Sequence, residues 1–512
     1  MAHDPTSFHF DQAPPYRRLH VALDRTPGSV SREIIFILRK RGEFDALAGE
    51  LYKRLDDRLG PEGYTKLLEI PLLRVVGVQV HEAHHVATLI RRMLEEGLVA
   101  GAEQNRPLRL TRAAAAVGPV VDDPLYPEQW SLEKIAAEAA WERTAGAGAL
   151  TVAIVDTGIS TMHPNLLPHL WTDGAGHHGF NVLDDSFDVA DLDGHGTLLA
   201  GTVRAVSNNA IGSAAAAAPI RMMAVKFHDE RRPPDTLTGL LGIVVAAWKR
   251  ARVVVLAWDL PTKSVALESA MALLNSPPFE MLFVAGAGND GLDNDDPSVL
   301  PTYPASYPLD NVVSVMASDS QDDRARFSNY GLTTVHLAAP GVRILSTHPS
   351  FASAAWREYG GTSAACAHVA GAAALLRALN FAWKPKQVRE HLVASVDRNW
   401  WLRCEARGRL NLGRAVCGPL TVTSPSAVTV WPKNATVTVK WTRAYQTPRC
   451  TSVRVLLSEN GGTTYSVLSS GHANTGSCAV KTPSHVIANA RLKLQSEQGP
   501  GLYDESEVFR VQ

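Results

Sequence analysis

Residues 151–158 read TVAIVDTG, a run of apolar residues that ends in an aspartate and a glycine. The apolar residues before Asp156 predict a buried strand, and similar runs at 252–257 and 281–285 alternate with helical segments. This alternation is typical of a parallel sheet covered by helices on both faces. Asp156 is therefore expected at the carboxyl end of a strand, the edge where such sheets form their sites.

A carboxylate at a strand end is open to more than one interpretation. It can cap the helix that follows, or it can belong to an aspartic protease, which needs two Asp-Thr-Gly carboxylates sharing a proton. The chain contains a single Asp-Thr-Gly, which disfavours a two-lobed protease of that class.

Two further motifs follow Asp156 along the chain. His195 stands in DGHGT (193–197), where glycines on both sides allow a tight turn before a helix of small residues. Ser363 begins a run of small residues that predicts a buried helix, whose first N–H groups and dipole favour a developing oxyanion. Each motif alone is compatible with a loop histidine or a serine N-cap. Together they predict nucleophilic catalysis, with His195 moving the serine proton.

Asn289 ends the run LFVAGAGN at 282–289. An amide at this strand end can donate to the oxyanion together with the Ser363 N–H. An asparagine after a glycine, here Gly288, is otherwise an ordinary turn residue.

The composition limits the classes of partner. The chain has 512 residues, which predicts two or three domains, and its formal net charge is −1 with no long run of either sign. Nucleic acid is therefore not an expected partner.

No stretch approaches the roughly 18 apolar residues of a membrane span. The first 25 residues lack the apolar core of a secretory signal, so no export signal is readable.

Changes in pattern divide the chain into five segments. Residues 1–32 are an N-terminal extension, and 33–108 follow the β-α-β-β-α-β order of a ferredoxin-like domain. Residues 109–122 are an Ala-rich linker, 123–418 are the α/β domain, and 419–512 alternate like a β-sandwich. The predicted fold class is α/β, a doubly wound, mostly parallel sheet, preceded by an α+β domain and followed by an all-β sandwich.

Five cysteines leave the redox compartment open. Two disulfides and one free thiol suit an oxidising compartment, whereas five thiols suit the cytosol. Cys404 with Cys417, and Cys450 with Cys478, are the candidate pairs. If these disulfides form, they indicate an extracellular protein, although no export signal is readable in the sequence.

The segment from Asp123 to Val416 resembles the subtilases, the subtilisin-like serine proteases of peptidase family S8. The three motifs stand in the subtilisin order of Asp, His and Ser. The resemblance also rests on four shorter segments: DPLYPEQW (123–130), YPASYP (303–308), FSNYG (327–331) and GRLN (408–411).

This resemblance implies a serine endopeptidase that cleaves peptide bonds through an acyl-enzyme on Ser363. His195 is then the general acid/base, Asp156 orients the imidazole, and Asn289 donates to the oxyanion. The expected partners are protein or peptide substrates.

The resemblance also assigns roles to the flanking domains. The ferredoxin-like domain looks like an inhibitory propeptide, released by self-cleavage between Arg112 and Val121, so the protein is expected to be a zymogen. A permanently attached regulatory domain is the alternative. The last domain resembles the Ig-like sandwiches of secreted bacterial proteases, which implies a targeting module without chemistry.

Four positions depart from the family pattern. Leu198 replaces a structural histidine, and Ala367 replaces a proline with no consequence that we can derive. Ala364 replaces the methionine beside the nucleophile, which removes an oxidisable thioether and favours peroxide tolerance. Cys366, three residues after Ser363, is a thiol that offsets this gain if it reacts.

The fourth departure concerns substrate binding. Where subtilases carry Ser-Leu-Gly to pair with the substrate backbone, this chain has Trp258 and Asp259 after its strand. A side chain then stands where a peptide approaches closely. We expect Trp258, Asp259 and Gly288 to contact substrate, with an altered or narrowed specificity around P1 to P4 that favours a basic residue.

Many subtilases bind calcium, and the corresponding ligands here are Gln129, Asn165 and Asn209. Asn165 replaces an aspartate, and Ca²⁺ prefers several anionic oxygens, so the resemblance implies a weak structural calcium site. Ordinary turn and capping roles remain the alternative.

Two functions from other classes compete with the protease. One is a catalytically silent subtilase fold that serves as a scaffold, and the other is an adhesion protein that acts through its β-sandwich. The four catalytic positions are all filled, which disfavours the scaffold.

Overall fold

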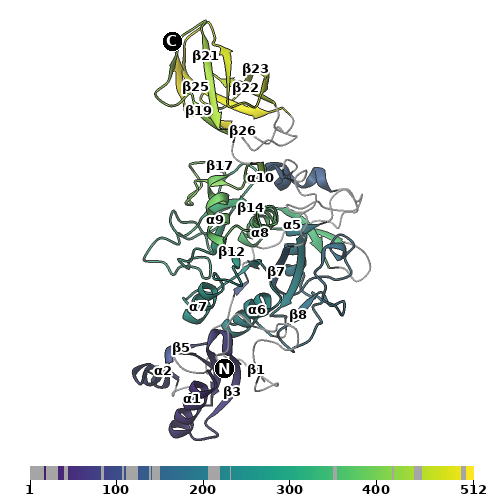
Figure 1. Ribbon diagram of the computed structural model, residues 1–512, viewed down its shortest axis with the longest axis vertical. Helices are drawn as coiled ribbons and strands as arrows, with labels where there is room; N and C mark the ends of the chain where they lie inside the picture. Colours follow the sequence, from purple (N-terminus) through teal and green to yellow (C-terminus); the bar gives the residue numbers. More distant parts are fainter. Residues whose placement is uncertain are drawn as a thin grey trace.

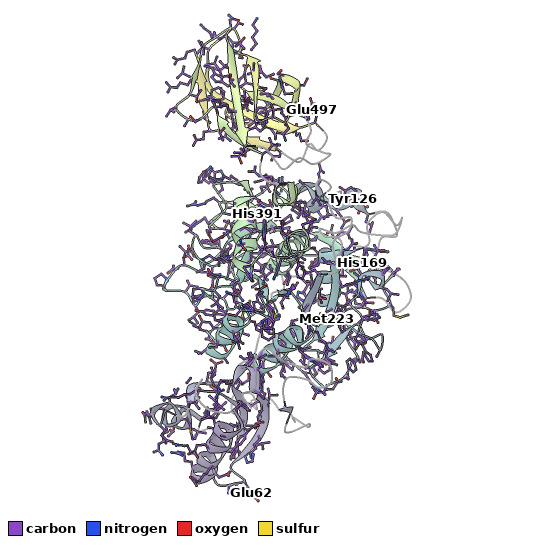
Figure 2. All side chains as sticks on the ribbon, in the orientation of Figure 1. Glu62, Tyr126, His169, Met223, His391 and Glu497 are labelled. Atoms are coloured by element: carbon purple, nitrogen blue, oxygen red, sulfur yellow. The ribbon has the colours of Figure 1, made fainter. Side chains whose placement is uncertain are left out.

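The computed structural model places three bodies in a row, in chain order (Figure 1). It describes residues 17–18, 33–39, 44–81, 86–97, 99–105, 109–110, 125–137, 140, 150–205, 220–230, 232–349, 355–417, 420–442, 452–497 and 503–512. Side chains fill the spaces between the ribbons, and the labelled Glu62 and Glu497 lie in the two outer bodies (Figure 2).

The first body is an antiparallel sheet with two helices. In the described residues its strand order is β1-β3-β4-β2-β5, the order of a ferredoxin-like sheet with β1 added at one edge. Ile34 and Phe36 of β2 pack beneath the helices, whereas Ile35 faces the middle body. Its elements are β1 (Arg17–Arg18), β2 (Glu33–Leu38), α1 (Phe44–Leu59), β3 (Tyr64–Ile70), β4 (Val75–Val80), α2 (Val86–Glu95) and β5 (Val99–Gln104).

The middle body is built on a sheet whose described strands follow the order β17-β18-β14-β13-β12-β10-β7-β9-β8. The pairs are parallel except for β17 with β18. Its first half comprises α3 (Trp130–Lys134), β7 (Leu150–Asp156), β8 (Gly179–Asn181), α5 (His195–Arg204), β9 (Ile220–Lys226), α6 (Thr236–Trp248), β10 (Val253–Leu256), β11 (Trp258–Asp259), α7 (Val265–Leu273) and β12 (Leu282–Gly286). Its second half comprises β13 (Val312–Ser318), β14 (Leu337–Pro340), β15 (Ile344–His348), β16 (Ala355–Tyr359), α8 (Thr362–Leu379), α9 (Pro385–Ala394), β17 (Asp397–Arg398), β18 (Gly408–Arg409) and α10 (Leu412–Cys417).

Helices cover both faces of this sheet, because its strands are apolar on both sides. In β7, Val152 and Ile154 pack in the layer that contains α5 and α8, whereas Ala153 and Val155 pack in the layer that contains α6 and α7. β9 lies on one side of β7 and β10 on the other. The connections therefore diverge at β7, and sites of doubly wound sheets form at such a strand end. The predicted fold class is confirmed.

Helix α8 passes through the centre of the middle body. Among the described residues it alone is long and apolar enough to cross a membrane by length and composition, but 89 % of it is buried inside the protein. It is therefore a core helix of the middle body.

The last body is a two-sheet sandwich. One sheet has the order β19-β21-β24 and the other β20-β27-β25-β22-β23, with β26 beside β25, counted over the described residues. Trp431, Trp441 and Phe509 lie in its core. Its strands are β19 (Thr421–Ser424), β20 (Val430–Trp431), β21 (Thr436–Thr442), β22 (Ser452–Ser458), β23 (Ser466–Ala473), β24 (Ser477–Lys481), β25 (Ile487–Ser496), β26 (Tyr503–Glu505) and β27 (Phe509–Val511).

An ion pair and one backbone hydrogen bond join the sandwich to the end of the middle body, and a further hydrogen bond holds the Asp504 carboxylate within the sandwich. Arg414 of α10 pairs with Asp504 of β26 at 3.0 Å and donates to the Tyr503 carbonyl oxygen. The other oxygen of Asp504 accepts the Val422 N–H at 2.8 Å. Both partners of the ion pair are largely buried, so removing one leaves an uncompensated charge.

Neither of the two candidate disulfides forms in the structure. Cys404 and Cys478 are free thiols. Cys404 is fully buried in a small apolar cluster with Met316 and Leu402, so packing holds its sulfur in place of a cross-link. The side chain of Cys417 and the whole of Cys450 lie outside the described residues.

Candidate active site

Asp156 is the last residue of β7 and is completely buried. Its Oδ1 accepts the Thr157 N–H at 2.8 Å. The chain then turns at Gly158, whose φ of 112° favours glycine. A Cβ on Gly158 would lie 2.4 Å from the Val189 carbonyl oxygen, so this turn requires the glycine of the motif.

His195 is the first residue of α5, and its Nδ1 lies 2.8 Å from Asp156 Oδ1. Because a carboxylate only accepts, Nδ1 carries the proton and Nε2 is left to accept one. The ring is 6 % exposed, and Nε2 has no hydrogen-bond partner among the described residues. This is the orientation that a general base needs.

Close packing brings the two motifs together. A Cβ on Gly196 would lie 2.1 Å from the Gly158 carbonyl oxygen, so only glycine allows α5 to approach β7 this closely. The Gly196 N–H donates to Thr157 Oγ1 at 2.9 Å. Asp191 caps the start of α5 by accepting the N–H groups of Gly194 and Thr197.

The surroundings of Asp156 keep its carboxyl group ionised. Burial is the largest single influence and raises the pKa of this carboxyl, but the charge and the hydrogen bond of the His195 imidazole oppose it. His228 and the Thr157 N–H act in the same direction, so the pKa of Asp156 lies below its usual value. The ionised carboxylate can therefore accept a hydrogen bond from the proton on His195 Nδ1.

Ser363 lies in the first turn of α8, after Gly361 with a φ of 123°. N–H groups in a first turn have no partner within the helix. Ser363 Oγ donates to the Ala257 carbonyl oxygen at 3.5 Å. Since Val255 is paired with Ile154, continuing this parallel register places Ala257 beside Asp156. The structure thus brings Asp156, His195 and Ser363 to one edge of the sheet.

Asn289 follows β12, two strands away from β7. Its Oδ1 accepts the Thr362 N–H at 2.9 Å, directly before Ser363. Its Nδ2 is buried and has no hydrogen-bond partner among the described residues. The amide therefore offers a donor beside the first turn of α8.

The predicted substrate residues occupy three different environments. The Trp258 side chain is buried, and its Nε1 donates to the Val155 carbonyl oxygen at 3.1 Å, so the side chain itself is not available to a peptide. Asp259 is 4 % exposed at the end of β11. Gly288 uses its N–H and carbonyl for Thr362 and Asn329, so it positions Asn289.

Sequence patterns did not indicate that the segment after the first body pairs at this edge. Strand β6 (Arg109–Leu110) pairs antiparallel with β11, Leu110 opposite Trp258 and Arg109 opposite Asp259. The edge strand beside Ala257 is therefore already paired with a segment of the same chain.

Two polar residues of the first body also contact helix starts in the middle body. Glu103 accepts the Val265 N–H at 2.7 Å and the Ala266 N–H at 3.4 Å at the start of α7. Asn105 accepts the Leu237 N–H at 3.0 Å at the start of α6. Both groups satisfy helix N–H donors that are otherwise unpaired, and Glu103 adds a charge of favourable sign.

The predicted calcium ligands do not form a described site. Gln129 and Asn165 are buried, and the Gln129 amide donates to the Leu345 carbonyl oxygen. Asn209 lies outside the described residues. No group of three or more His, Cys, Asp or Glu residues suited to a metal occurs in the part of the chain that the structure describes.

Comparisons with known proteins agree with this geometry. The model of the "Subtilase family" matches residues 147–415. Thermitase of Thermoactinomyces vulgaris is 32 % identical over 58 % of this chain and 98 % of its own. A thermophilic serine proteinase of Bacillus sp. (strain AK1) is 36 % identical over 48 % of this chain and 57 % of that protein.

Solved structures extend the likeness in fold. Fervidolysin from Fervidobacterium pennivorans, described as a keratinolytic enzyme related to subtilisin, aligns over 98 % of this chain and 79 % of its own, with a TM-score of 0.60 and 19 % identity. The epidermin leader peptide processing serine protease from Staphylococcus aureus aligns over 75 % of this chain and 98 % of its own, with a TM-score of 0.59 and 20 % identity. The family model, which matches more than half of the chain, shows that this protein belongs to the subtilase family of serine proteases.

Proposed function

We propose that the chain is a serine endopeptidase, made as a zymogen, in which Ser363 attacks the scissile carbonyl carbon. His195 Nε2 takes the hydroxyl proton and later gives it to the leaving amine. Asp156 holds the imidazole and stabilises its protonated form. The observation that carries this proposal is the 2.8 Å bond between Asp156 and His195 at the sheet edge where α8 presents Ser363.

The negative charge of the tetrahedral intermediate needs donors that are already in place. Asn289 Nδ2 and the Ser363 N–H are the proposed pair. The Asn289 side chain is suited to this role because Thr362 holds its oxygen.

The first body is proposed to inhibit the enzyme until self-cleavage releases it. Chain direction supports this role, because β6 runs antiparallel to β11 and Leu110 lies opposite Trp258. Trp258 is the chain neighbour of Ala257, whose carbonyl oxygen accepts the Ser363 hydroxyl. The proposed cleavage, between Arg112 and Val121, falls outside the described residues. An extended segment paired with the edge strand occupies the position that a substrate needs.

Asp259 is the proposed specificity residue on the edge strand. Its side chain is 4 % exposed, and a buried carboxylate favours a cationic partner. Cleavage profiles of Asp259→Gly and the unchanged enzyme on a peptide library test this role. An identical profile would contradict it.

The main experiment labels the purified full chain with a fluorophosphonate and follows its intact mass. We expect labelling and a cut between Arg112 and Val121 in the wild type, and neither in Ser363→Ala. Ser466→Ala, at an exposed position of β23, is the matched control and should behave as the wild type does. A cleavage rate that is independent of protein concentration indicates cleavage within one chain. An unlabelled, intact wild type would favour the silent scaffold.

A further inference from the structure

Two neighbouring tryptophans are exposed on the loop that joins β17 to β18, residues 399–407, which we call the tryptophan loop. Trp400 is 63 % exposed and Trp401 is 85 % exposed. The other tryptophans that the structure describes are buried or partly buried. Exposed apolar patches mark contact sites, whereas single exposed apolar residues are ordinary. The tryptophan loop is therefore a candidate for binding a partner.

Hydrogen bonds hold the tryptophan loop in one shape. The Asn399 N–H donates to the Arg407 carbonyl oxygen at 2.7 Å and closes the loop. The Asn399 side chain donates to the Asp322 carbonyl oxygen at 2.8 Å and accepts the Trp401 N–H at 3.1 Å. Leu402 is fully buried in an apolar cluster beneath the loop. The loop is thus anchored at its base, and the exposure of the two indoles is a fixed feature of the fold.

Two arginines flank the indoles. The guanidinium carbon of Arg398 lies 5.9 Å from the centre of the Trp400 ring, within the range of a cation–π contact. Arg407 donates to the Trp400 carbonyl oxygen at 3.3 Å. Neither arginine forms an ion pair with a residue that the structure describes. Both positive charges are available to an anionic partner.

The charges around the loop leave a small positive balance. Arg403 pairs with Asp293 at 2.8 Å, so this pair adds no net charge. On Arg398, the loop and the adjoining segment 319–326, four arginines and three carboxylates form no ion pair with a described Lys, Arg, Asp or Glu: Arg324, Arg326, Arg398, Arg407, Asp319, Asp323 and Glu405. Four positive charges against three negative ones give +1, and the groups that flank the indoles are the positive ones.

A lipid surface fits these properties. A side chain that is 85 % exposed protrudes, so its partner has to surround it, and a layer of lipid headgroups can deform to do so. Indole combines an apolar ring with a polar N–H, and tryptophan is enriched at the membrane–water interface for this reason. Arginine lays its stem along an apolar layer and places its guanidinium among phosphate groups.

We propose that the tryptophan loop binds the surface of an anionic lipid bilayer. Trp400 and Trp401 enter the headgroup layer, and Arg398 and Arg407 pair with lipid phosphates. So few side chains give a reversible attachment, unlike a helix that spans the bilayer. The proposal goes beyond the protease function, because it places the molecule at a membrane whatever reaction the molecule performs.

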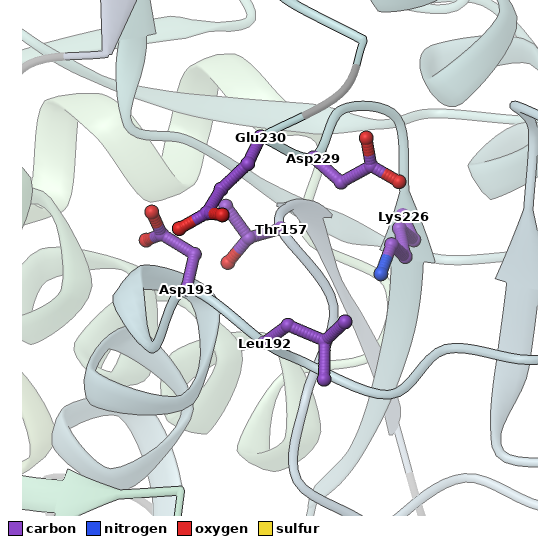
Figure 3. Close-up of a pocket in the computed structure, with 6 residues that line it drawn as sticks. All are labelled: Thr157, Leu192, Asp193, Lys226, Asp229 and Glu230. Carbon is purple, nitrogen blue, oxygen red and sulfur yellow. The ribbon is translucent and has the colours of Figure 1, made fainter.

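The tryptophan loop lies apart from the reacting groups. Four strands separate β18 from β7 in the sheet, which corresponds to roughly 24 Å at the usual strand spacing. The cavity of about 200 Å³ beside the Asp156–His195 pair is lined by residues of other segments (Figure 3): Thr157, Leu192, Asp193, Lys226, Asp229 and Glu230. Substitutions in the tryptophan loop therefore test attachment without changing the catalytic residues.

The test measures how the full Ser363→Ala chain co-sediments with lipid vesicles, so it does not depend on the protease function. We expect binding to vesicles of phosphatidylcholine and phosphatidylglycerol, weaker binding to phosphatidylcholine alone, and a loss of this difference at high salt. Replacing both Trp400 and Trp401 by Ala should lower the partition coefficient by roughly tenfold or more. Arg398→Gln and Arg407→Gln should each lower it by roughly fivefold on the anionic vesicles alone.

Insertion of the indoles has its own readout. Brominated lipids should quench the tryptophan fluorescence of the parent chain more than that of the variant without Trp400 and Trp401. Phe381→Ala, at an aromatic residue that is 67 % exposed after α8, and Arg91→Gln, at an exposed position of α2, are the matched controls and should bind as the parent does.

Two results would overturn the lipid proposal. One is equal partition of the parent chain and the variant without Trp400 and Trp401, including the case in which neither binds vesicles. The other is a concentration-dependent dimer in sedimentation velocity that this variant abolishes, because the loop would then bind a second copy of the chain. Either result leaves the protease function standing, since labelling of Ser363 tests that function separately.

Discussion

Asn289 Oδ1 and the Thr362 backbone N–H are joined by a 2.9 Å hydrogen bond, which fixes the rotation of the Asn289 amide. With its oxygen engaged, the amide presents Nδ2 as a donor directly beside the first turn of α8. A donor held in this way needs no reorganisation when charge develops.

Removal of this donor should slow the chemical step. Asn289→Ala is expected to lower kcat by roughly 10²–10³ with little change in KM, the loss known for an oxyanion donor in subtilisin, a relative of this protein. Asn289→Asp keeps an acceptor for the Thr362 N–H but loses the donor, so its kcat should be no higher than that of Asn289→Ala. Steady-state kinetics, recorded after self-cleavage, give kcat and KM of both variants. Wild-type kcat in Asn289→Asp would show that the residue only supports the helix.

Catalysis should require both the negative charge of the Asp156 carboxylate and the oxygen that accepts from His195. Asp156→Asn is expected to lower kcat by roughly 10⁴, because an amide favours the wrong imidazole tautomer. The fold should persist, since an amide oxygen still accepts the Thr157 N–H. Circular dichroism and fluorophosphonate labelling rates separate the two effects. A variant that is folded and labels at the wild-type rate would contradict the role of Asp156.

Glu103 should delay activation. Its carboxylate contacts two N–H groups at the start of α7, so Glu103→Gln removes a charge from a helix N-terminus. We expect the lag before peptidase activity appears to become roughly three- to tenfold shorter, because the substitution weakens charge-assisted hydrogen bonds. Glu62→Gln, an exposed position in the first body, is the matched control (Figure 2). Equal lags in all three proteins would show that Glu103 does not hold the first body in place.

The enzyme should tolerate hydrogen peroxide. Ala364 has no thioether, and Cys366 is fully buried with its Sγ directed to the Val284 carbonyl oxygen at 3.1 Å. Burial raises the pKa of the Cys366 thiol, which keeps the reactive thiolate scarce. Ala364→Met should lose activity in peroxide and gain one oxygen in mass at that residue. Rapid inactivation of the wild type with oxidation at Cys366 would refute the expectation.

Stability should fall with acid as buried histidines are forced to accept protons. Burial lowers the pKa of His336 to about 3 and that of His368 to about 4, whereas an unfolded histidine titrates near 6.5. Between these values the unfolded chain binds protons that the folded chain does not. The free energy of unfolding therefore falls as pH decreases, by up to about 1.4 kcal/mol per pH unit for each residue.

His336 provides the sharper test of this pH dependence. Its Nδ1 accepts the Ser314 N–H at 2.8 Å, and protonation would replace this acceptor with a donor. Unfolding of the Ser363→Ala chain between pH 7 and 5 should show a smaller pH dependence in His336→Gln. His485→Gln, at an exposed ring paired with Glu459, should retain the parent slope. Equal slopes in all three chains would contradict a contribution from His336.

Local patterns in the sequence predicted the elements of the site well. Glycines at 158, 196 and 361 mark places where the backbone turns or approaches closely, and these constraints are visible in the sequence because no other residue meets them. The predicted strand before Asp156 and the predicted helix after Ser363 are β7 and α8.

Contacts between distant segments were not predictable in the same way. The Trp258 side chain is buried, and its Nε1 donates to the Val155 carbonyl oxygen. Cys404 is held by apolar packing and has no disulfide partner. Glu103 was an unremarkable strand residue in the sequence, yet it contacts the start of α7. Nothing in the local pattern around these residues specifies which distant group lies opposite.

The sequence by itself determined the order of the elements and the identity of the three motifs, because hydrophobic period and glycine geometry are local properties of a chain. Only the tertiary structure decided that the Asn289 amide is held by Thr362 and that β6 pairs with β11. It also decided that residues around 157, 193 and 229 enclose one acidic cavity. These relationships depend on packing across the sheet edge, where residues far apart in sequence become neighbours.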